Sequence, residues 1–316
     1  MGKEKILVIG AGGQIGSVLI YELAKTYGRE NIIASDLRIQ EGRLEKFVQL
    51  DVLNKEKLFE LVDDEKVTQI YHLAAILSAS GEANPLRTWD INMAGLFNVL
   101  EVARERNLNK VFFPSSIAVF GADAPPNHTP QNTALNPTTV YGMSKVAGEH
   151  WAQYYHLKYG LDIRSVRYPG IIGYQSNPGG GTTDYAVDIY HKAVLGEKYA
   201  CFLEENTALP MIYMDDAIQA TVQLMEAPAE KVKLRTSYNL SGMSFSPKEI
   251  TAAIQQHFPN FAVSYAPDFR QQIAESWPRS IDDAVARADW GWQPTYDLEK
   301  MTADMILNLK KKYKKQ

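Results

Sequence analysis

The chain has 316 residues, of which 45% are hydrophobic and 22% are charged, which is an ordinary balance for one large globular domain or two smaller ones. Its formal net charge of −4 at pH 7 offers no electrostatic attraction to nucleic acid, so we expect no nucleic-acid partner. No apolar run approaches the roughly 20 residues of a membrane-spanning helix and no signal-peptide pattern is present, so we expect a cytoplasmic protein without a membrane partner.

The metal-ligating residue types are sparse. Cys201 is the single cysteine, which excludes a disulfide within the chain and a site built from several thiolates. The six histidines are scattered and form no HExxH pattern. The sequence therefore predicts no metal site.

The first 170 residues alternate short β-rich runs with longer helical patterns. The apolar runs are nearly continuous, which is typical of strands buried on both faces of a parallel sheet with helices on each side. We predict an α/β fold with a doubly wound parallel sheet, a Rossmann fold, whose ligands bind beyond the carboxyl ends of the strands. The predicted strands span residues 5–10, 31–36, 46–52, 68–75, 110–116 and 162–170, and clear helical patterns span 15–28 and 93–107.

After residue 170 the pattern changes. A glycine-rich stretch follows, and residues 210–235 then read as a strand and a helix that return to the main sheet. The region from 236 onward is less regular and contains three of the five tryptophans. We predict a nucleotide-binding domain of residues 1–170 with 210–235, and a smaller interleaved substrate or lid region of residues 171–209 and 236–316.

Three glycines separate the first predicted strand from the first predicted helix. Gly10, Gly13 and Gly16 have the spacing GxxGxxG. Without Cβ atoms the chain can turn sharply there, and a pyrophosphate can approach the N–H groups at the start of the helix. The strand–turn–helix context predicts a dinucleotide site that also includes Gln14 and Ile15.

Acidic residues after the next two strands extend this site. Asp36 follows the second strand, where a carboxylate accepts hydrogen bonds from the adenosine ribose and repels a 2′-phosphate. We therefore expect NAD rather than NADP, although Arg38 is a type of residue that serves NADP. The remaining expected contacts to the nucleotide are Leu37, Asp51 and Val52, together with Leu73, Ala74 and Ala75 in the sequence HLAA.

A later helical pattern carries a tyrosine and a lysine one turn apart. We expect Asn136 as its N-cap, Pro137 in its first turn and Gly160 as its C-terminal cap. Tyr141 and Lys145 then share one face. Spacing alone does not separate a catalytic pair from an ordinary surface pair.

The motifs GxxGxxG, HLAA, DINMAG, SSIAVFG and YGMSK follow one another in the order found in the extended short-chain dehydrogenases/reductases, and the chain resembles that family over nearly its whole length. The resemblance implies a catalytic triad of Ser116, Tyr141 and Lys145, with Ser115 as a second hydroxyl at the substrate. It also implies a proton relay from Asn92 to Lys145. The resemblance further implies contacts of the cofactor with Asn92, Tyr141, Lys145, Tyr168 and Pro169.

The triad types suit proton abstraction. A free tyrosine has a pKa of about 10, too high for a base at neutral pH. One ammonium about 5 Å away favours the phenolate by roughly 3 kcal/mol at an effective dielectric constant near 20. We therefore expect a Tyr141 pKa near 8, roughly two units below the free value.

The segments around PGGGTTDYAV, LPMIYMDD and SWPRSIDD resemble the short-chain type of L-threonine 3-dehydrogenases. This implies NAD-dependent oxidation of the threonine 3-hydroxyl to 2-amino-3-oxobutanoate by a homodimer packed through two helices of each subunit. Two alternatives stay open, a nucleotide-sugar epimerase/dehydratase and a non-enzymatic dinucleotide sensor. Residues 198–234 contain no arginine, which argues against a diphosphate substrate.

The substrate contacts are expected in two loops. Thr182, Thr183 and the N–H groups of residues 179–181, with Gly180 at their centre, are candidates for binding the threonine carboxylate. Ser78 and Trp277 are candidates for further walls of the site. Each has an ordinary alternative, because Ser78 and Thr182 also suit helix caps and Trp277 also suits core packing.

Overall fold

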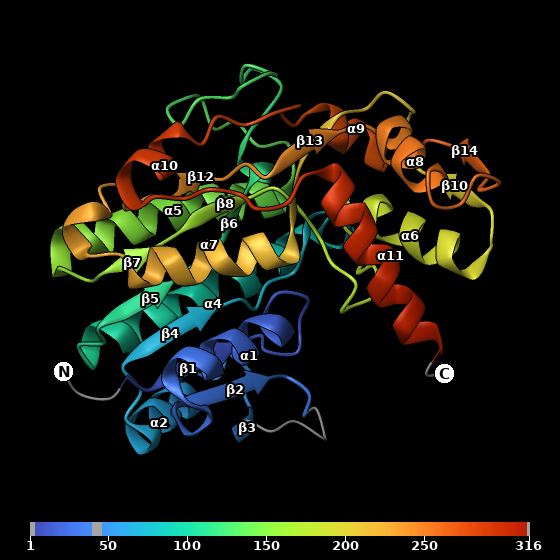
Figure 1. Ribbon diagram of the computed structural model, residues 1–316. Helices are drawn as coiled ribbons and strands as arrows, with labels where there is room; N and C mark the ends of the chain where they lie inside the picture. The colour runs from blue at the N-terminus through green and yellow to red at the C-terminus, as the bar shows by residue number, and fades with distance from the viewer. Residues whose placement is uncertain (1–3, 40–45, 315–316) are drawn as a thin grey trace.

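The computed structural model describes residues 4–39 and 46–314. Its centre is a six-stranded sheet in the order β3-β2-β1-β4-β5-β7, and every pairing in it is parallel. The doubly wound α/β prediction is confirmed (Figure 1). The strands are β1 (Ile6–Ile9), β2 (Ile32–Asp36), β3 (Lys46–Gln49), β4 (Gln69–His72), β5 (Lys110–Phe112) and β7 (Ile163–Arg164).

Two hydrophobic cores lie on the two faces of this sheet. In β1, Ile6 and Val8 belong to one core and Leu7 and Ile9 to the other, which is the alternation that a strand imposes on its side chains. Helices α1 (Gly16–Tyr27) and α7 (Met214–Glu226) contribute to the first core. Helices α2 (Lys55–Glu65), α4 (Pro85–Glu105) and α5 (Val140–Tyr159) contribute to the second.

The strand order reverses between β1 and β4, because successive strands run outward from β1 to β3 and then from β4 to β7. Ligands of doubly wound sheets bind at such a switch point, beyond the carboxyl ends of the strands. The glycine-rich turn leaves the sheet there, directly after β1.

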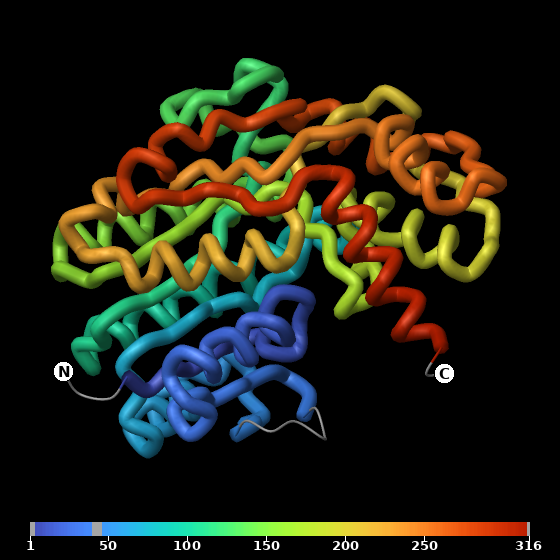
Figure 2. Tube along the Cα trace, in the orientation of Figure 1, coloured from blue at the N-terminus to red at the C-terminus, as the bar shows by residue number. Residues whose placement is uncertain are grey.

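A third core belongs to a smaller unit on the right of Figures 1 and 2. It contains three helices that pack on one another, α6 (Tyr185–Leu195), α8 (Pro247–Gln255) and α11 (Leu298–Lys314). Three small sheets complete the described part of the fold. They comprise β12-β8-β6 (Tyr238–Asn239, Val166–Tyr168, Ser115–Ser116), β13-β11-β9 (Met243–Phe245, Leu209–Tyr213, Gly170–Ile172) and β10-β14 (Tyr199–Cys201, Val263–Tyr265).

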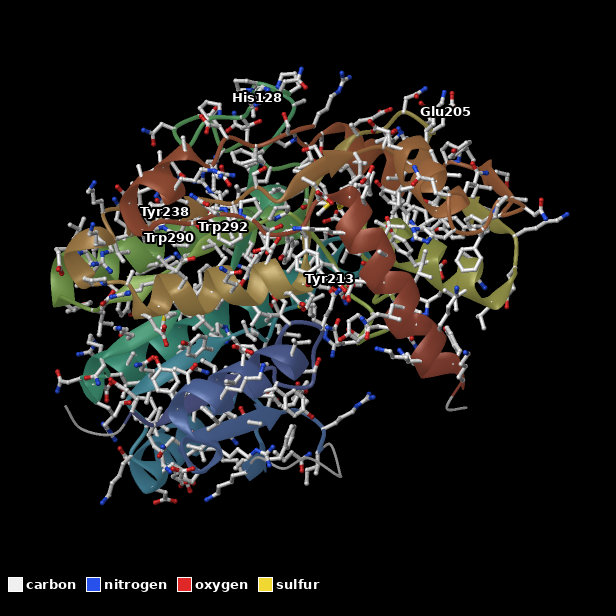
Figure 3. The ribbon with its side chains drawn as sticks, in the orientation of Figure 1. His128, Glu205, Tyr213, Tyr238, Trp290 and Trp292 are labelled. Carbon is white, nitrogen blue, oxygen red and sulfur yellow. The ribbon has the colours of Figure 1, made fainter. Side chains whose placement is uncertain are left out.

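The chain returns to the nucleotide-binding part over a longer stretch than residues 210–235. Tyr238, Trp290 and Trp292 pack in the same core as β1 and α1, and Figure 3 shows them grouped close to α7. The rings of Tyr238 and Trp290 are 5.8 Å apart, and Trp290 ends helix α10 (Ala284–Trp290). We propose a two-unit division that keeps the expected boundary near residue 170 and adds these returning segments to the first unit.

Helix α5 begins three residues later than expected. Thr139 is its N-cap, and its hydroxyl accepts a hydrogen bond from the N–H of Gly142 at 3.1 Å. The prediction of Asn136 as the cap is wrong, because the Asn136 amide donates to Asp123 instead. The C-terminal prediction is confirmed, since Gly160 closes the helix with φ +74°.

Within residues 4–39 and 46–314, no helix has both the length and the apolar character needed to cross a membrane. In the same part of the chain, no group of three His, Cys, Asp or Glu side chains is arranged to hold a metal ion.

Candidate active site

Two pockets open at the carboxyl ends of the parallel strands, and both are lined by Leu73 and Ala75 of the segment after β4. We call the one lined by Gly10 and Gly13 the glycine pocket, and the one lined by Tyr141 the tyrosine pocket. The expected site residues that line the glycine pocket are Gly10, Gly13, Asp36, Leu37, Asp51, Val52, Leu73, Ala74 and Ala75. Those that line the tyrosine pocket are Gln14, Ile15, Leu73, Ala75, Ser78, Ser115, Ser116, Tyr141, Lys145, Tyr168, Pro169, Thr182, Thr183 and Trp277.

The glycine turn packs closely against neighbouring backbone because it lacks side chains. Gly10 has φ +86°, and a Cβ there would lie 2.7 Å from the backbone nitrogen of Ala74. A Cβ on Gly16 would lie 2.3 Å from the carbonyl oxygen of Gly10. Gly16 is thus needed for the close packing of α1 beneath the turn and does not line either pocket. The turn fits the close approach of a pyrophosphate to the start of α1.

Asp36 is held at the end of β2 with its carboxylate at the glycine pocket. One oxygen accepts a hydrogen bond from the N–H of Gly12 at 2.9 Å, and the other accepts from the N–H of Leu37 at 2.8 Å. Arg38 is exposed and lies outside the described lining of the pocket. The geometry therefore fits a ribose diol at Asp36, and Arg38 is not placed in the described lining to meet a 2′-phosphate.

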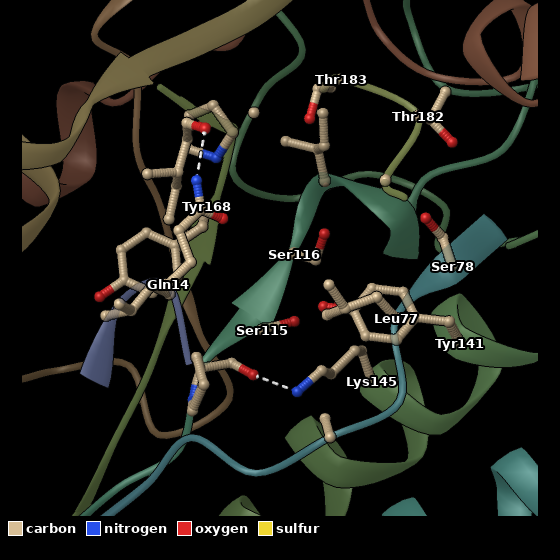
Figure 4. Close-up of a pocket in the computed structure, with 18 of the residues that line it drawn as sticks. Gln14, Leu77, Ser78, Ser115, Ser116, Tyr141, Lys145, Tyr168, Thr182 and Thr183 are labelled. Atoms are coloured by element: carbon tan, nitrogen blue, oxygen red, sulfur yellow. Dashed lines mark hydrogen bonds between the residues drawn. The ribbon is translucent and has the colours of Figure 1, made fainter. Parts of the chain in front are cut away.

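Ser116, Tyr141 and Lys145 converge in the tyrosine pocket (Figure 4). The Ser116 hydroxyl lies close enough to the Tyr141 phenol to act on its pKa, and both side chains line the same pocket. The Lys145 ammonium nitrogen lies 5.4 Å from the centre of the Tyr141 ring and donates to the carbonyl oxygen of Pro114 at 2.7 Å. The hydroxyls of Ser116 and Tyr141 and the amine of Lys145 therefore belong to the same pocket.

Burial dominates the protonation of this group. It raises the pKa of Tyr141 to about 12, against the smaller opposite effect of the hydrogen bond with Ser116. Burial also lowers the pKa of Lys145 to about 7, and the charge of Glu149 opposes that shift. The expected Tyr141 pKa near 8 is wrong for the protein's own residues, because it counted the attraction of an ammonium and omitted the cost of burying a phenolate.

Two polar residues near the triad are engaged elsewhere. Ser115 donates its hydroxyl proton to Glu149 at 2.6 Å, so this hydroxyl is available to a substrate only as an acceptor. The Asn92 amide accepts from the N–H of Ile76 at 2.8 Å and donates to its carbonyl at 3.1 Å and to Ser144 at 3.3 Å. Asn92 does not line either pocket in the described residues, and no direct hydrogen bond joins its side chain to Lys145 there. Its amide instead provides hydrogen-bond partners for the backbone N–H and carbonyl of Ile76, which lies after the end of β4 and outside the sheet.

The walls opposite the triad contain unpaired donors. Thr182 is buried, and its hydroxyl has no hydrogen-bond partner within the described structure. The indole N–H of Trp277, which can only donate, is also buried and unpaired there. Ser78 lies buried at the start of the short helix α3 (Ser78–Gly81), but Leu77 occupies its N-cap position. Unpaired buried donors in a pocket indicate a place for an acceptor ligand.

The glycine loop binds a carboxylate of its own chain. The N–H groups of Gly179, Gly180 and Gly181 donate to one oxygen of Asp184 at 2.6, 2.7 and 2.8 Å. Gly180 lies outside the described lining of the tyrosine pocket. The expectation that these N–H groups are available to a substrate carboxylate is wrong for this conformation. A carboxylate a few residues away in the chain closes such a small loop at little entropic cost.

Several lining residues were not anticipated from the sequence. Ile171 is one of them, and its carbonyl accepts a hydrogen bond at 3.3 Å from the side-chain amide of Gln14, an expected site residue (Figure 4). Most of the unanticipated residues contribute backbone or apolar surface, and such residues form no recognisable sequence motif. Asp184 is different, because it ends the PGGGTTD stretch and could have been predicted from that motif. The unanticipated lining residues are Leu77, Pro114, Ile117, Gly170, Ile171 and Asp184 in the tyrosine pocket, and Ile9, Leu50, Leu53, Ile76, Arg87 and Ile91 in the glycine pocket.

Comparisons with known proteins agree with this architecture. The model of the NAD dependent epimerase/dehydratase family matches residues 6–241. An uncharacterized epimerase/dehydratase of Staphylococcus haemolyticus is 48% identical over 314 residues, which cover 98% of each chain.

Two solved structures are similar over almost the whole chain. A partial consensus L-threonine 3-dehydrogenase is 56% identical with a TM-score of 0.96, covering 97% of this chain and 99% of that one. The holo form of a GalE-like L-threonine dehydrogenase from Cupriavidus necator is 55% identical with a TM-score of 0.95, covering 96% of this chain and 99% of that one. The chain described here is a member of the NAD dependent epimerase/dehydratase family, and its cofactor is NAD.

Proposed function

We propose that the protein is an L-threonine 3-dehydrogenase, which oxidises the 3-hydroxyl of L-threonine to a ketone and forms 2-amino-3-oxobutanoate. The observation that carries the proposal is the pair of unpaired donors at Thr182 and Trp277, which share a pocket with the hydroxyl pair of Ser116 and Tyr141. The names of the two similar solved structures support the same reaction.

The charges of the tyrosine pocket suit a small zwitterion. Lys145 and Asp184 are the only charged side chains in its described lining. The donors of Thr182 and Trp277 match a carboxylate, and the Asp184 carboxylate is the one anionic group in that lining for an ammonium. A nucleotide sugar would bring a diphosphate, for which this lining has no arginine. Threonine therefore fits better than a nucleotide sugar.

The reaction assigns each member of the triad a separate task. Tyr141 accepts the proton of the 3-hydroxyl while the C3–H bond breaks with its electron pair, so that a carbonyl forms. Ser116 holds the reacting oxygen at the phenol, and the positive charge of Lys145 stabilises the phenolate. NAD, when bound, supplies the hydride acceptor and a cationic ring that also favours the phenolate.

An assay of substrate choice tests the proposal. The purified protein with NAD is expected to form NADH with L-threonine. We expect far less with 3-hydroxybutyrate, which keeps the hydroxyl and the carboxylate but lacks the ammonium. UDP-sugars are expected to give neither NADH nor epimerised product. Turnover of a UDP-sugar without threonine oxidation would contradict the proposal and favour an epimerase.

Asp36→Ala is expected to relax the choice of cofactor. The variant loses the acceptor for the ribose hydroxyls and the charge that repels a 2′-phosphate, so kcat/KM with NAD should fall roughly tenfold while kcat/KM with NADP rises. The measurement is the ratio of kcat/KM for the two cofactors. Arg38→Ala is the matched control and should leave this ratio nearly unchanged, because Arg38 lies outside the glycine pocket. Equal use of both cofactors by the unmutated protein would show that Asp36 does not select the cofactor.

We also propose a cytoplasmic homodimer that packs through α4 and α5. These two helices pack against each other and carry a row of exposed apolar side chains. Leu157 is 77% exposed, and the other members of the row are Trp89, Met143, Trp151 and Tyr154. Apolar surface of this kind on neighbouring helices is typical of an interface between subunits.

Leu157→Glu is expected to shift the protein from dimer to monomer, because it places a charge in the proposed interface. Light scattering after gel filtration measures the mass. Leu195→Glu on α6 is the matched control, since Leu195 is also exposed but lies outside α4 and α5. An unmutated protein that is monomeric at micromolar concentration would exclude this interface.

A further inference from the structure

A buried ion pair lies directly behind the tyrosine pocket. The Glu149 carboxylate accepts from the Arg167 guanidinium through both oxygens, at 2.9 and 2.8 Å, and both side chains are almost fully buried. One of these oxygens also accepts the hydroxyl proton of Ser115 at 2.6 Å. Ser115 and Arg167 are register partners in β6 and β8, so two strands and α5 meet at this carboxylate.

The guanidinium has further partners that fix its place. Arg167 donates to the Asn239 side chain at 3.0 Å and to the carbonyl of Gln131 at 3.2 Å. Its plane also lies over the Phe120 ring, 5.3 Å from the ring centre. Glu149 is therefore held rigidly, with Ser115 as its only hydroxyl partner among the described residues.

Glu149 is also aligned with the reacting groups. Tyr141, Lys145 and Glu149 follow one another at intervals of four residues in α5, so they occupy successive turns of one helix face. The attraction of Glu149 opposes the effect of burial on the Lys145 ammonium. His72, at the end of β4, is a further titratable group close to Lys145; burial and Lys145 together lower its pKa to about 3, so it stays neutral.

We propose that Glu149 is a positioning residue of the dehydrogenase reaction. It acts through Lys145, whose positive charge it supports, and through Ser115, whose hydroxyl it anchors beside the substrate-facing Ser116. The link to substrate turnover rests on the proposed threonine oxidation. The link to the charge of Lys145 is a property of the protein and holds for any reaction at this tyrosine.

Three variants separate this role from a purely structural one. Glu149→Gln keeps the shape and the acceptor for Ser115 but removes the charge. The double variant Glu149→Gln, Arg167→Met also removes the Arg167 cation, which Glu149→Gln alone leaves buried and unpaired. The double variant replaces the single variant in the test if the single variant fails to fold. Ser115→Ala keeps the ion pair and removes only the hydroxyl.

The first readout is the reactivity of Lys145 in the protein without substrate. Reductive methylation modifies the neutral amine, and mass spectrometry of the Lys145 peptide follows it as a function of pH. In Glu149→Gln the midpoint is expected to move at least about one pH unit lower, because the ammonium loses its stabilising charge. In the double variant it should move in the same direction, and in Ser115→Ala it should not move. Lys158, exposed on the same helix, is the internal control.

The second readout is the pH profile of kcat for threonine. A less charged Lys145 stabilises the Tyr141 phenolate less, so the acidic limb of Glu149→Gln should move to higher pH by about one unit. At neutral pH kcat should then fall about tenfold, while the KM for threonine changes by less than about threefold. Ser115→Ala should lower kcat about equally at every pH.

The two readouts keep the proposals distinguishable. Folded Glu149→Gln or double variants with an unchanged Lys145 midpoint and an unchanged acidic limb would overturn the role of Glu149. A shifted midpoint in a protein that does not oxidise threonine would support the role of Glu149 and reject threonine as the substrate.

Discussion

Tyr141→Phe is expected to lower kcat for threonine oxidation by about a thousandfold, within the range of general-base contributions. Phenylalanine keeps the ring beneath Lys145 and removes only the hydroxyl that is proposed to accept the proton. The affinity for NAD should change by less than about threefold, because the loss falls on the chemical step. Steady-state kinetics and NAD binding by calorimetry measure the two quantities.

The pH profile adds an independent check on Tyr141. The base must be deprotonated, so oxidation by the unmutated enzyme should accelerate as pH rises toward the raised pKa of Tyr141. The remaining activity of Tyr141→Phe should lack this dependence. Tyr159→Phe, on the same helix but exposed, is the matched control and should retain full activity. A Tyr141→Phe enzyme with a tenth of the unmutated kcat would refute the assignment.

Thr182→Val is expected to raise the KM for threonine roughly a hundredfold. Valine fills the same volume but removes a buried donor, and a carboxylate bound there would lose a charge-assisted hydrogen bond while remaining desolvated. The hydroxyl has no partner within the described structure, so its removal should not lower the stability of the unliganded protein. Kinetics with threonine and thermal unfolding test both parts.

A truncated substrate and a neighbouring residue sharpen the test of Thr182. The compound 1-amino-2-propanol lacks the carboxylate of threonine, so its kcat/KM should be the same in Thr182→Val and in the unmutated enzyme. Thr183→Val should raise the KM for threonine by less than about tenfold, because its hydroxyl is not among the buried unpaired donors. Equal KM values for threonine in Thr182→Val and the unmutated enzyme would move the carboxylate site elsewhere.

The nucleotide-binding half of the molecule was readable from local pattern. Continuous apolar runs predicted each strand of the parallel sheet, and Gly10, Gly13 and Gly16 predicted the turn that follows β1. Asp36 was identified from its place at the end of the second strand, and the structure holds its carboxylate at the glycine pocket. Such features depend on the order of residues within one strand–turn–helix unit, so neighbouring residues in the sequence suffice to specify them.

The protonation of the site and its supporting contacts depended on residues far apart in the chain. Glu149 meets Ser115 and Arg167 only because α5, β6 and β8 come together, and Asn92 binds the backbone of Ile76 for a similar reason. The Tyr141 pKa was expected near 8 from helix spacing, whereas burial in the folded protein raises it to about 12.

Helix spacing specifies which side chains are neighbours along α5, and the four-residue interval by itself therefore places Tyr141 and Lys145 on one face. Desolvation is different, because it depends on every segment that covers a group, and no local pattern records those segments. The same holds for the Asp184 carboxylate, which takes the N–H groups of Gly179 to Gly181 once the loop has folded back. Local order thus specified the fold and the reacting residues, and packing specified their charges and partners.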